Sequence, residues 1–539
     1  MRALSKYMVL LLCLLGVLSS ALAETTPGKV DDGGVRRSIA DYLDSGASLP
    51  LPIKAARDGL EKYYLQDKGP LLWTKPSKLD EFAKLLSASG EDGLFPKDYA
   101  IEHIQVLRDT VHSKDAQLRA WLELSYSSFL IRYAQDLGGG RVLPQKIAPE
   151  VFGKRARPDA ANILHDFARS QSLQGFSVSQ MPADEQYERL RKKLAEYQLI
   201  ARGGGWGKVP GRKSMRLGNR GKRVERMRAR LEFTGDVAYV AERRDVFDEV
   251  LEQAVKRYQK RNGMKEDGIA GRHVIIAMNI SAEERVRQIA VNMERWRWIR
   301  DVQAERVLTV NLASNTFRYE VGNELVEETP LVRRKANAKL PVMSDDVSRL
   351  EVRPSDIVPP AIAGPAYFER ISKDPGKAAK QGIQIYFKGR NVPAEAIEWS
   401  DYSAENFPFT IRRRLNKGDP AGYIRLTFSE NDAACLGGAV PQKRVKPNDK
   451  FAPNCLTLVR ADEFTNALLG KDATKVGSIL ADEKRAHAIY SSPFETPIPV
   501  RILYATAWVD NAGIINFRPD RVHRDLKLYK ALQGRHSLR

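Results

Sequence analysis

The change from helix to strand along this chain begins at Arg306-Val307-Leu308-Thr309-Val310-Asn311, which a short loop joins to Thr316-Phe317-Arg318-Tyr319-Glu320-Val321. Both segments alternate apolar and polar residues, which is the period of a half-buried β-strand. They therefore predict paired strands. Residues 423–428 and 500–509 carry further strand patterns. The C-terminal part of the chain is predicted to be mainly β, with helices inserted.

The sequence before these strands has the period of helices instead. Residues 55–64, 79–87, 101–111 and 116–135 each place apolar residues at spacings of three and four, which is typical of amphipathic helices. Glycine-containing breaks separate these segments. The fold class predicted for the whole chain is therefore multi-domain α+β, with a helical N-terminal scaffold.

A compact helical unit is predicted over residues 246–280. The last turn of its first helix is followed by Asn262-Gly263, a helix-ending pair, and Asp267-Gly268-Ile269-Ala270-Gly271 then forms a tight turn. The next helix is expected to begin at Arg272. One face of the first helix carries six apolar residues, namely Phe247, Val250, Leu251, Ala254, Val255 and Tyr258. This pattern resembles the small three-helix peptidoglycan-binding module of many cell-wall enzymes, and a generic helical hairpin is the alternative.

The N-terminus and the charge balance indicate an exported protein. Residues 1–23 have a basic start, a short apolar run and Ala21-Leu22-Ala23 at the end, which is the pattern of a signal peptide. Residues 24–50 show no clear period and are interpreted as a mobile leader. The formal net charge is +20. In an exported chain this charge favours an anionic envelope polymer or surface as partner, and a solvated basic face remains the alternative.

A basic linker is predicted at residues 202–223. It opens with Arg202-Gly203-Gly204-Gly205-Trp206-Gly207 and continues with seven lysines and arginines. It marks a domain boundary, and it is interpreted either as a solvated linker or as a site for a polyanion.

A series of short motifs resembles the L,D-transpeptidases, in the large Gram-negative subtype with a helical scaffold and a peptidoglycan-binding module. No single motif is specific, but their order and spacing from Trp73 to Asp525 match that family. The motifs are Asp92-Gly93-Leu94, Gly204-Gly205-Trp206, the helix end from Asn292 to Trp298, Val358-Pro359-Pro360-Ala361-Ile362-Ala363, Trp399-Ser400-Asp401-Tyr402-Ser403, Asn406-Phe407-Pro408, Thr506-Ala507-Trp508-Val509-Asp510 and Phe517-Arg518-Pro519-Asp520. The resemblance implies a mainly-β catalytic domain that performs cysteine acyl transfer on peptidoglycan stem peptides.

The resemblance also implies a catalytic loop, and this chain departs from it. The family has an upstream histidine and then Ser/Thr-His-Gly-Cys, in which the histidine before the cysteine activates the thiol. The nucleophile position falls on Cys455. The other positions hold different residues: Gly437 for the upstream histidine, Ala452, Pro453 and Asn454 for Ser/Thr-His-Gly, Thr457 for an arginine and Asp356 for a tryptophan. Of these, Asn454 can still adopt the left-handed conformation of the family glycine. Catalysis is therefore expected to be impaired.

Two further expectations rest on the same resemblance. Cys435 precedes Gly437 by two residues, so a strand would place both on one face, beside the nucleophile, and a Cys435–Cys455 disulfide is plausible. Two unpaired thiols are the alternative. Arg412, Arg413 and Arg414 precede a glycine-containing turn and are candidates for binding the carboxylates of stem peptides, with a solvated face as the alternative.

The expected function is that of a periplasmic L,D-transpeptidase-family protein acting on peptidoglycan stem peptides. The alternatives are a non-catalytic peptidoglycan-binding or scaffold pseudoenzyme of the same fold, in contact with other cell-wall enzymes, and a basic protein that binds another envelope polymer. No cofactor, metal, nucleic acid or transmembrane helix is expected. The predicted divisions are 1–23 signal peptide, 24–50 mobile leader, 51–235 helical scaffold domain with basic linker, 236–290 peptidoglycan-binding-like module, 291–525 L,D-transpeptidase-like catalytic domain and 526–539 C-terminal tail.

Overall fold

The computed structural model describes most of the chain. The described residues are 31–45, 49–147, 151–152, 157–237, 243–302, 304–322, 324–331, 342–352, 355–358, 360–380, 382–414, 424–429, 435–438, 455–469 and 490–533. The predicted signal peptide, the loop positions Ala452, Pro453 and Asn454, and the end of the predicted tail lie outside them.

The chain divides into two compact units. The first comprises residues 1–89, 95–135 and 158–180, and the second comprises residues 90–94, 136–157 and 181–539. None of the helices within the described ranges is long and apolar enough to cross a membrane.

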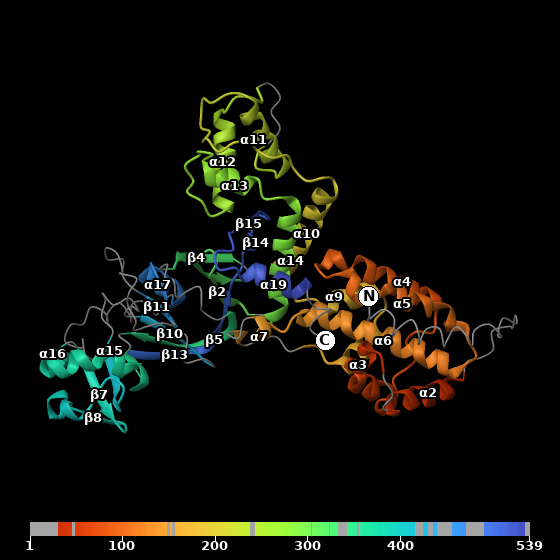
Figure 1. The fold of residues 1–539 in the computed structure, drawn as a ribbon, viewed down its shortest axis with the longest axis horizontal. Coiled ribbons are helices and arrows are strands. Elements are labelled where there is room, and N and C mark those ends of the chain that lie inside the picture. The colour runs from red at the N-terminus through yellow and green to blue at the C-terminus, as the bar shows by residue number, and fades with distance from the viewer. Residues whose placement is uncertain are drawn as a thin grey trace. The chain divides into compact units, whose positions relative to one another are not determined.

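The first unit is helical, as the three- and four-residue spacing predicts (Figure 1). Its core is built around Trp73, which is fully buried and has its ring about 5 Å from the rings of Phe82, Tyr126 and Phe167. The helices up to residue 180 are α2 (Asp32–Asp44), α3 (Leu51–Glu61), the π-helix η1 (Lys62–Gln66), α4 (Pro76–Ala88), η2 (Ser89–Asp92), η3 (Pro96–Tyr99), α5 (Ile101–Val106), η4 (Arg108–His112), α6 (Ala116–Gly139), α7 (Pro144–Ile147), α8 (Ala160–Arg169) and α9 (Leu173–Gln180).

The prediction of a mobile leader over residues 24–50 is wrong for helix α2. Asp31 caps this helix by accepting a hydrogen bond from the Gly33 N–H. Val35, Ile39 and Leu43, spaced four residues apart, are buried on one face. The polar residues between them conceal this apolar stripe, but its spacing is that of an amphipathic helix.

The helical module of the second unit has the two helices predicted within residues 246–280 and a third that begins at Lys222, before the predicted module start at residue 236. They are α11 (Lys222–Phe233), α12 (Glu249–Arg261) and α13 (Arg272–Met278), and their apolar side chains form one buried cluster that also includes Val209 and Met215. Gly263 ends α12 with a φ of 64°, a conformation that glycine adopts without strain. Val250, predicted on the buried face, is instead 45% exposed, because in the first turn of α12 it points away from the cluster.

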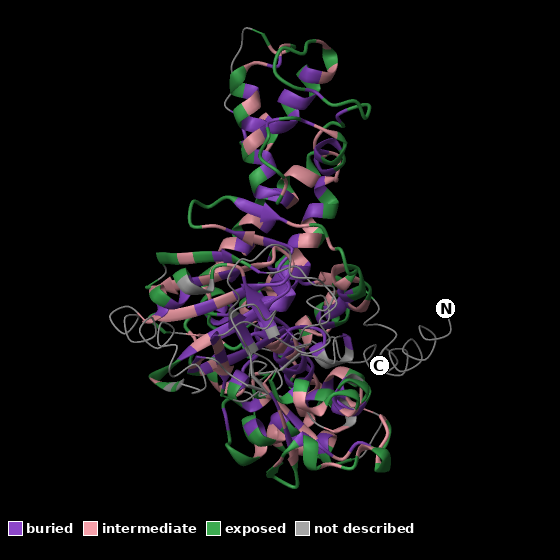
Figure 2. Cartoon of the chain, turned by 90° about the vertical axis from the view of Figure 1, so that its left-hand side faces the viewer, coloured by how far each residue is buried: buried purple, intermediate pink, exposed green. Residues whose placement is uncertain are grey.

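Two long helices connect this module to the β-rich part of the second unit. They are α10 (Glu185–Arg202) and α14 (Ala282–Trp298), and α14 begins with a capping box between Ser281 and Glu284. Every residue from Val291 to Trp298 is buried (Figure 2). The last helix of the chain is α19 (Arg524–Gln533).

The main sheet has nine described strands, in the order β12-β11-β10-β5-β13-β2-β3-β4, with β1 paired to β5. The predicted hairpin is confirmed as β2 and β3, which pair antiparallel from Arg306↔Val321 to Asn311↔Thr316. The strands are β1 (Val151–Phe152), β2 (Arg306–Asn311), β3 (Thr316–Val321), β4 (Glu324–Pro330), β5 (Val342–Val352), β10 (Ile424–Phe428), β11 (Cys435–Gly438), β12 (Cys455–Leu458) and β13 (Tyr490–Leu503).

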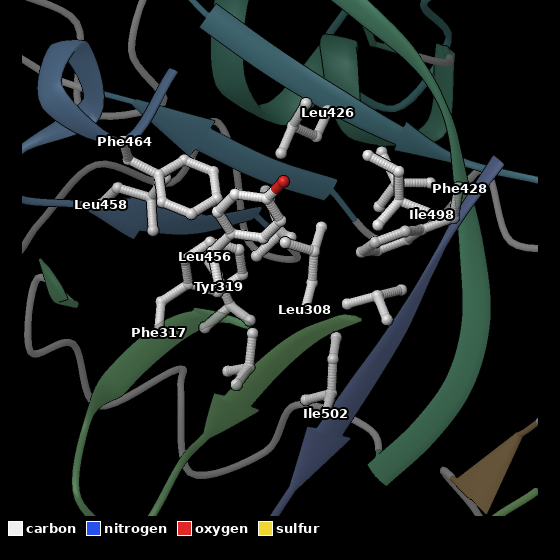
Figure 3. Packing of buried hydrophobic residues seen from close by; sticks show 14 of the residues in the cluster. Leu308, Phe317, Tyr319, Leu426, Phe428, Leu456, Leu458, Phe464, Ile498 and Ile502 are labelled. Atoms are coloured by element: carbon white, nitrogen blue, oxygen red, sulfur yellow. The ribbon is translucent and has the colours of Figure 1, made fainter. Parts of the chain in front are cut away.

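The two ends of this strand order approach one another. Leu331, directly after β4, forms an antiparallel bridge with Leu458 of β12, and the Val459 N–H donates to the Pro330 carbonyl at 2.9 Å. Helix α17 (Ala461–Leu469) lies over this junction and inserts Phe464 into the core, where its ring centroid is 4.4 Å from that of Phe317 (Figure 3). The sheet therefore curls around one apolar core.

A smaller sheet interrupts the main one in sequence. Its strand order is β6-β9-β7-β8, and it has its own buried cluster, which includes Tyr367, Phe407 and Phe409. A separate antiparallel pair is formed by β14 and β15. These elements are β6 (Ser355–Val358), α15 (Pro360–Lys373), α16 (Pro375–Lys380), β7 (Ile383–Phe387), β8 (Arg390–Val392), η6 (Ala394–Ala396), η7 (Trp399–Asp401), β9 (Thr410–Arg414), β14 (Ala507–Val509) and β15 (Ile515–Phe517).

Candidate functional site

The two cysteines of the candidate site lie on neighbouring strands of the main sheet. Strands β11 and β12 pair in parallel, and their register places Cys435 opposite Cys455 and Gly437 opposite Thr457. Neighbouring strands are about 4.8 Å apart, which is within the separation of Cα atoms that a disulfide can bridge. The backbone thus brings together the two cysteine positions that are twenty residues apart in sequence.

These positions fall on the face of the sheet opposite the core. Leu436 and Leu456, which alternate with them, are buried in the apolar cluster of the main sheet. Because successive residues of a strand face opposite sides, Cys435 and Gly437 share one face, as the sequence predicts. Thr457 lies on that face and is only 1% exposed, so the face is covered at this point.

Two arginines lie on the same face and were missed by the sequence reasoning. Arg425 of β10 pairs with Gly437, and Arg349 of β5 pairs with Thr427, which in turn pairs with Cys435. The alternation of residues 423–428 could have identified Arg425, since it places this arginine on the side away from Leu426. Arg349 had no such signal, because β5 was not predicted as a strand.

The predicted arginine cluster belongs to the smaller sheet. Arg412, Arg413 and Arg414 form the end of β9, and their backbone pairs with β6 and β7. The guanidinium of Arg412 lies 5.8 Å from the ring centroid of Tyr386. The structure therefore places these three residues in a different sheet from the two cysteines.

Several motifs that carry the resemblance form one buried polar network. The side-chain amide of Asn292 donates to the Thr506 hydroxyl at 2.8 Å, and its oxygen accepts from the Thr506 N–H at 2.9 Å. The Thr506 hydroxyl donates to Asp525 at 2.6 Å, and Arg295 donates to the same carboxylate at 2.6 Å. Burial raises the pKa of Asp525, and Arg295 opposes this effect. These residues join α14 to Thr506, directly before β14, and to the first turn of α19.

Asp520, in the last of those motifs, has a similar structural role. Its carboxylate accepts hydrogen bonds from the backbone N–H groups of Arg524, Asp525 and Leu526 at the start of α19. It also accepts a hydrogen bond from the Tyr504 hydroxyl at 2.9 Å. The motif thus caps α19 and ties it to the strand region.

Comparisons with known proteins agree with this architecture. The family model described as "Scaffold domain" matches residues 58–194, and that described as "Putative peptidoglycan binding domain" matches residues 220–278, which contain α11, α12 and α13. A curated relative, the "Putative L,D-transpeptidase" of Haemophilus influenzae, is 25% identical over 248 residues, 44% of this chain and 48% of the relative. The chain is therefore similar to the L,D-transpeptidases, the family that its motifs resemble.

The matched stretch spans about half the length of that curated L,D-transpeptidase. The crystal structure of an L,D-transpeptidase from Xylanimonas cellulosilytica covers 55% of this chain and 100% of its own, with 10% sequence identity and a TM-score of 0.15. The similarity to this family rests on the sequence relative and on the two matched domains, and the fold class predicted from sequence is confirmed.

Proposed function

We propose that this chain is an exported, periplasmic L,D-transpeptidase-family protein that acts on peptidoglycan and whose cysteine acyl transfer is impaired. In the family reaction, the cysteine sulfur bonds to the carbonyl carbon of a donor stem peptide as the amine leaves with a proton. An acceptor amine then attacks the thioester and releases the sulfur. A nearby histidine is needed because a thiol at its free pKa is mostly protonated near neutrality.

The observation that carries this proposal is the register of β11 and β12. It sets Gly437 opposite Thr457, one residue pair along the strands from Cys435 and Cys455. The resemblance assigns these two positions to a histidine and an arginine, and neither residue here can hold or move a proton for the thiol. No histidine lies between His273 and His487 in the sequence. Loss of a general base typically costs about 10² to 10⁴ in rate.

Restoring the base tests whether its loss is the cause. The double variant Gly437→His with Pro453→His is compared with the unaltered protein in its rate of acylation by a carbapenem, a drug class that acylates the cysteine of this family. We expect the double variant to be acylated at least about tenfold faster than the unaltered protein. Adding Cys455→Ala should abolish the acylation. No gain in acylation, with the fold retained, would contradict the proposal.

A non-catalytic scaffold is the second candidate, and the same register favours it. Cys435 and Cys455 are direct partners on adjacent strands, so a disulfide in the oxidising periplasm would turn the nucleophile position into a cross-link. It would close a loop of about twenty residues and stabilise the fold by about 3 kcal/mol in the chain-entropy model.

Intact mass before and after reduction tests this second candidate. A cross-linked chain is lighter by about two mass units, because one disulfide replaces two S–H bonds. The mass difference should vanish in Cys435→Ala and in Cys455→Ala. An unchanged mass on reduction would exclude the cross-link and leave two free thiols.

A further inference from the structure

A cleft in the second unit lies between the helical module and the segment that leads into α19. Its volume is about 940 Å³, which is in the range of small-molecule sites. The turn between α12 and α13, helix α13 itself and the first half of α14 form one side. Residues 517–529 form the other side. The cleft is formed by elements far apart in sequence, and none of the residues of the cysteine site lines it.

The cleft contains a buried cation that is held only by neutral groups. Arg285 of α14 is 4% exposed. Its guanidinium donates to the side-chain oxygen of Gln288 at 2.7 Å and to that of Asn262 at 3.3 Å, and it lies 4.1 Å from the ring centroid of Phe517. Among the described residues, no carboxylate forms an ion pair with it. Burial lowers the pKa of Arg285, and neighbouring Arg261 lowers it further.

The carboxylates that line the cleft are already engaged. Asp525 is paired with Arg295, and Asp520 caps α19. Asp267 accepts from Gln259 at 2.8 Å, and Glu284 closes the capping box of α14. Because a buried charge with no ionic partner is costly, an anion bound in the cleft would stabilise Arg285.

The mouth of the cleft adds positive charge and apolar surface. Lys265, Arg272 and Arg521 are exposed there. Ile276 of α13 is 51% exposed and Leu526 of α19 is 49% exposed. A ligand that fits this lining has a carboxylate for the buried guanidinium and small apolar groups for the surface around it.

We propose that this cleft binds a carboxylate of a peptidoglycan stem peptide, with Arg285 as the cation that receives it. The inference rests on the proposed action on peptidoglycan and adds a position and a recognition chemistry to it. The site is separate from the cysteines, so it holds the wall polymer whether or not the cysteine reacts.

Arg285→Met separates binding from structural support. An apolar side chain of similar length removes a buried unpaired charge, a change that is often neutral or stabilising. The full-length protein is titrated with a soluble disaccharide-tetrapeptide muropeptide by isothermal calorimetry. We expect affinity to fall at least tenfold while Tm is unchanged or higher. Arg226→Met, at an exposed position of α11 outside the cleft, is the matched control and should bind normally.

A second variant keeps the test decisive if Arg285→Met folds poorly. Ile276→Asp places a carboxylate at the exposed mouth, where it repels the ligand's carboxylate, and affinity should again fall at least tenfold. Val250→Asp, at a similarly exposed position of the same module outside the cleft, should have no effect. A muropeptide with amidated carboxyl groups should not bind the unaltered protein.

Two outcomes would overturn the inference. In the first, Ile276→Asp and a folded Arg285→Met both bind the muropeptide with an affinity within twofold of that of the unaltered protein. In the second, the unaltered protein sediments with whole peptidoglycan sacculi but does not bind the muropeptide. That result would refute the proposed binding site in the cleft and leave the proposed action on peptidoglycan intact. Absence of binding to both muropeptide and sacculi would refute the proposed action on peptidoglycan as well.

Discussion

The buried carboxylate of Glu123 should make the stability of the first unit depend on pH. Glu123 lies in α6 and is 1% exposed. It accepts hydrogen bonds from the Leu72 and Trp73 N–H groups and from the Tyr64 hydroxyl. Burial raises its pKa from 4.5 to about 6, and the hydrogen bonds only partly oppose this effect.

The sign and size of the effect follow from that shift. Because the folded state holds the proton more tightly than the unfolded state, the free energy of unfolding falls as pH rises from 4.5 to 6. A shift of about 1.5 pKa units corresponds to about 2 kcal/mol. The contribution of Glu123 is therefore fully present below pH 4.5 and is lost by about pH 6 to 7.

Glu123→Gln isolates this contribution because an amide does not titrate. Urea unfolding is followed at several values between pH 4.5 and pH 7 by pulsed hydrogen exchange of peptides from residues 116–135 of α6, which report on the first unit alone. The unaltered protein should lose about 2 kcal/mol more than the variant over this range. Glu102→Gln, at an exposed position of α5, is the control and should follow the unaltered protein. Parallel pH profiles for Glu123→Gln and the unaltered protein would refute the reasoning.

Two further substitutions test the contacts of the second unit. Thr506→Val removes a fully buried hydroxyl that joins Asn292 to Asp525, so it should destabilise the unit by about 2 to 4 kcal/mol. Thr410→Val, at a partly exposed position, is the control and should change Tm little. Gly140→Ala adds a Cβ that would lie 2.7 Å from the Trp298 ring nitrogen, at a φ of 84°. Gly218→Ala has a φ of 86° and open space around the new Cβ, so Gly140→Ala should lower the free energy of unfolding by about 1 to 3 kcal/mol more than its control. Equal melting temperatures within either pair would contradict the corresponding assignment.

Elements with a regular pattern could be predicted from the sequence. The helix end expected from Asn292 to Trp298 belongs to α14, and the helix expected to begin at Arg272 is α13. In both, the apolar period and a local start signal agree. The paired strands β2 and β3 were predicted for the same reason, because their alternation is uninterrupted.

Strand β5 could not be predicted, although it is the strand that pairs with β10 and β13 inside the main sheet. Its sequence places two consecutive polar residues, Ser344 and Asp345, at buried positions, so no apolar–polar alternation marks the strand. Buried polar residues are satisfied by tertiary contacts that a local pattern cannot show. The cleft around Arg285 was missed for a related reason, since its two sides come from distant segments.

The candidate site was predictable only in part. The resemblance identified Cys455 and Cys435, and the register places them side by side, but their bonding stays a prediction. The substituted loop positions Ala452, Pro453 and Asn454 lie outside the described residues. The arginines at 412–414 are in the smaller sheet, and their contact with stem peptides stays a prediction. Arg349 and Arg425 are the arginines that lie on the same face of the main sheet as the two cysteine positions.

The most direct measurement is the intact mass of the reduced, unaltered protein after exposure to a carbapenem. Reduction frees both thiols, so a failure to react then reports on the missing base rather than on a cross-link. An adduct that forms at least about 10²-fold more slowly than on an L,D-transpeptidase with both histidines, or no adduct, is the predicted result. A rapid stoichiometric adduct that is lost in Cys455→Ala and retained in Cys435→Ala would contradict the account and show a fully active nucleophile.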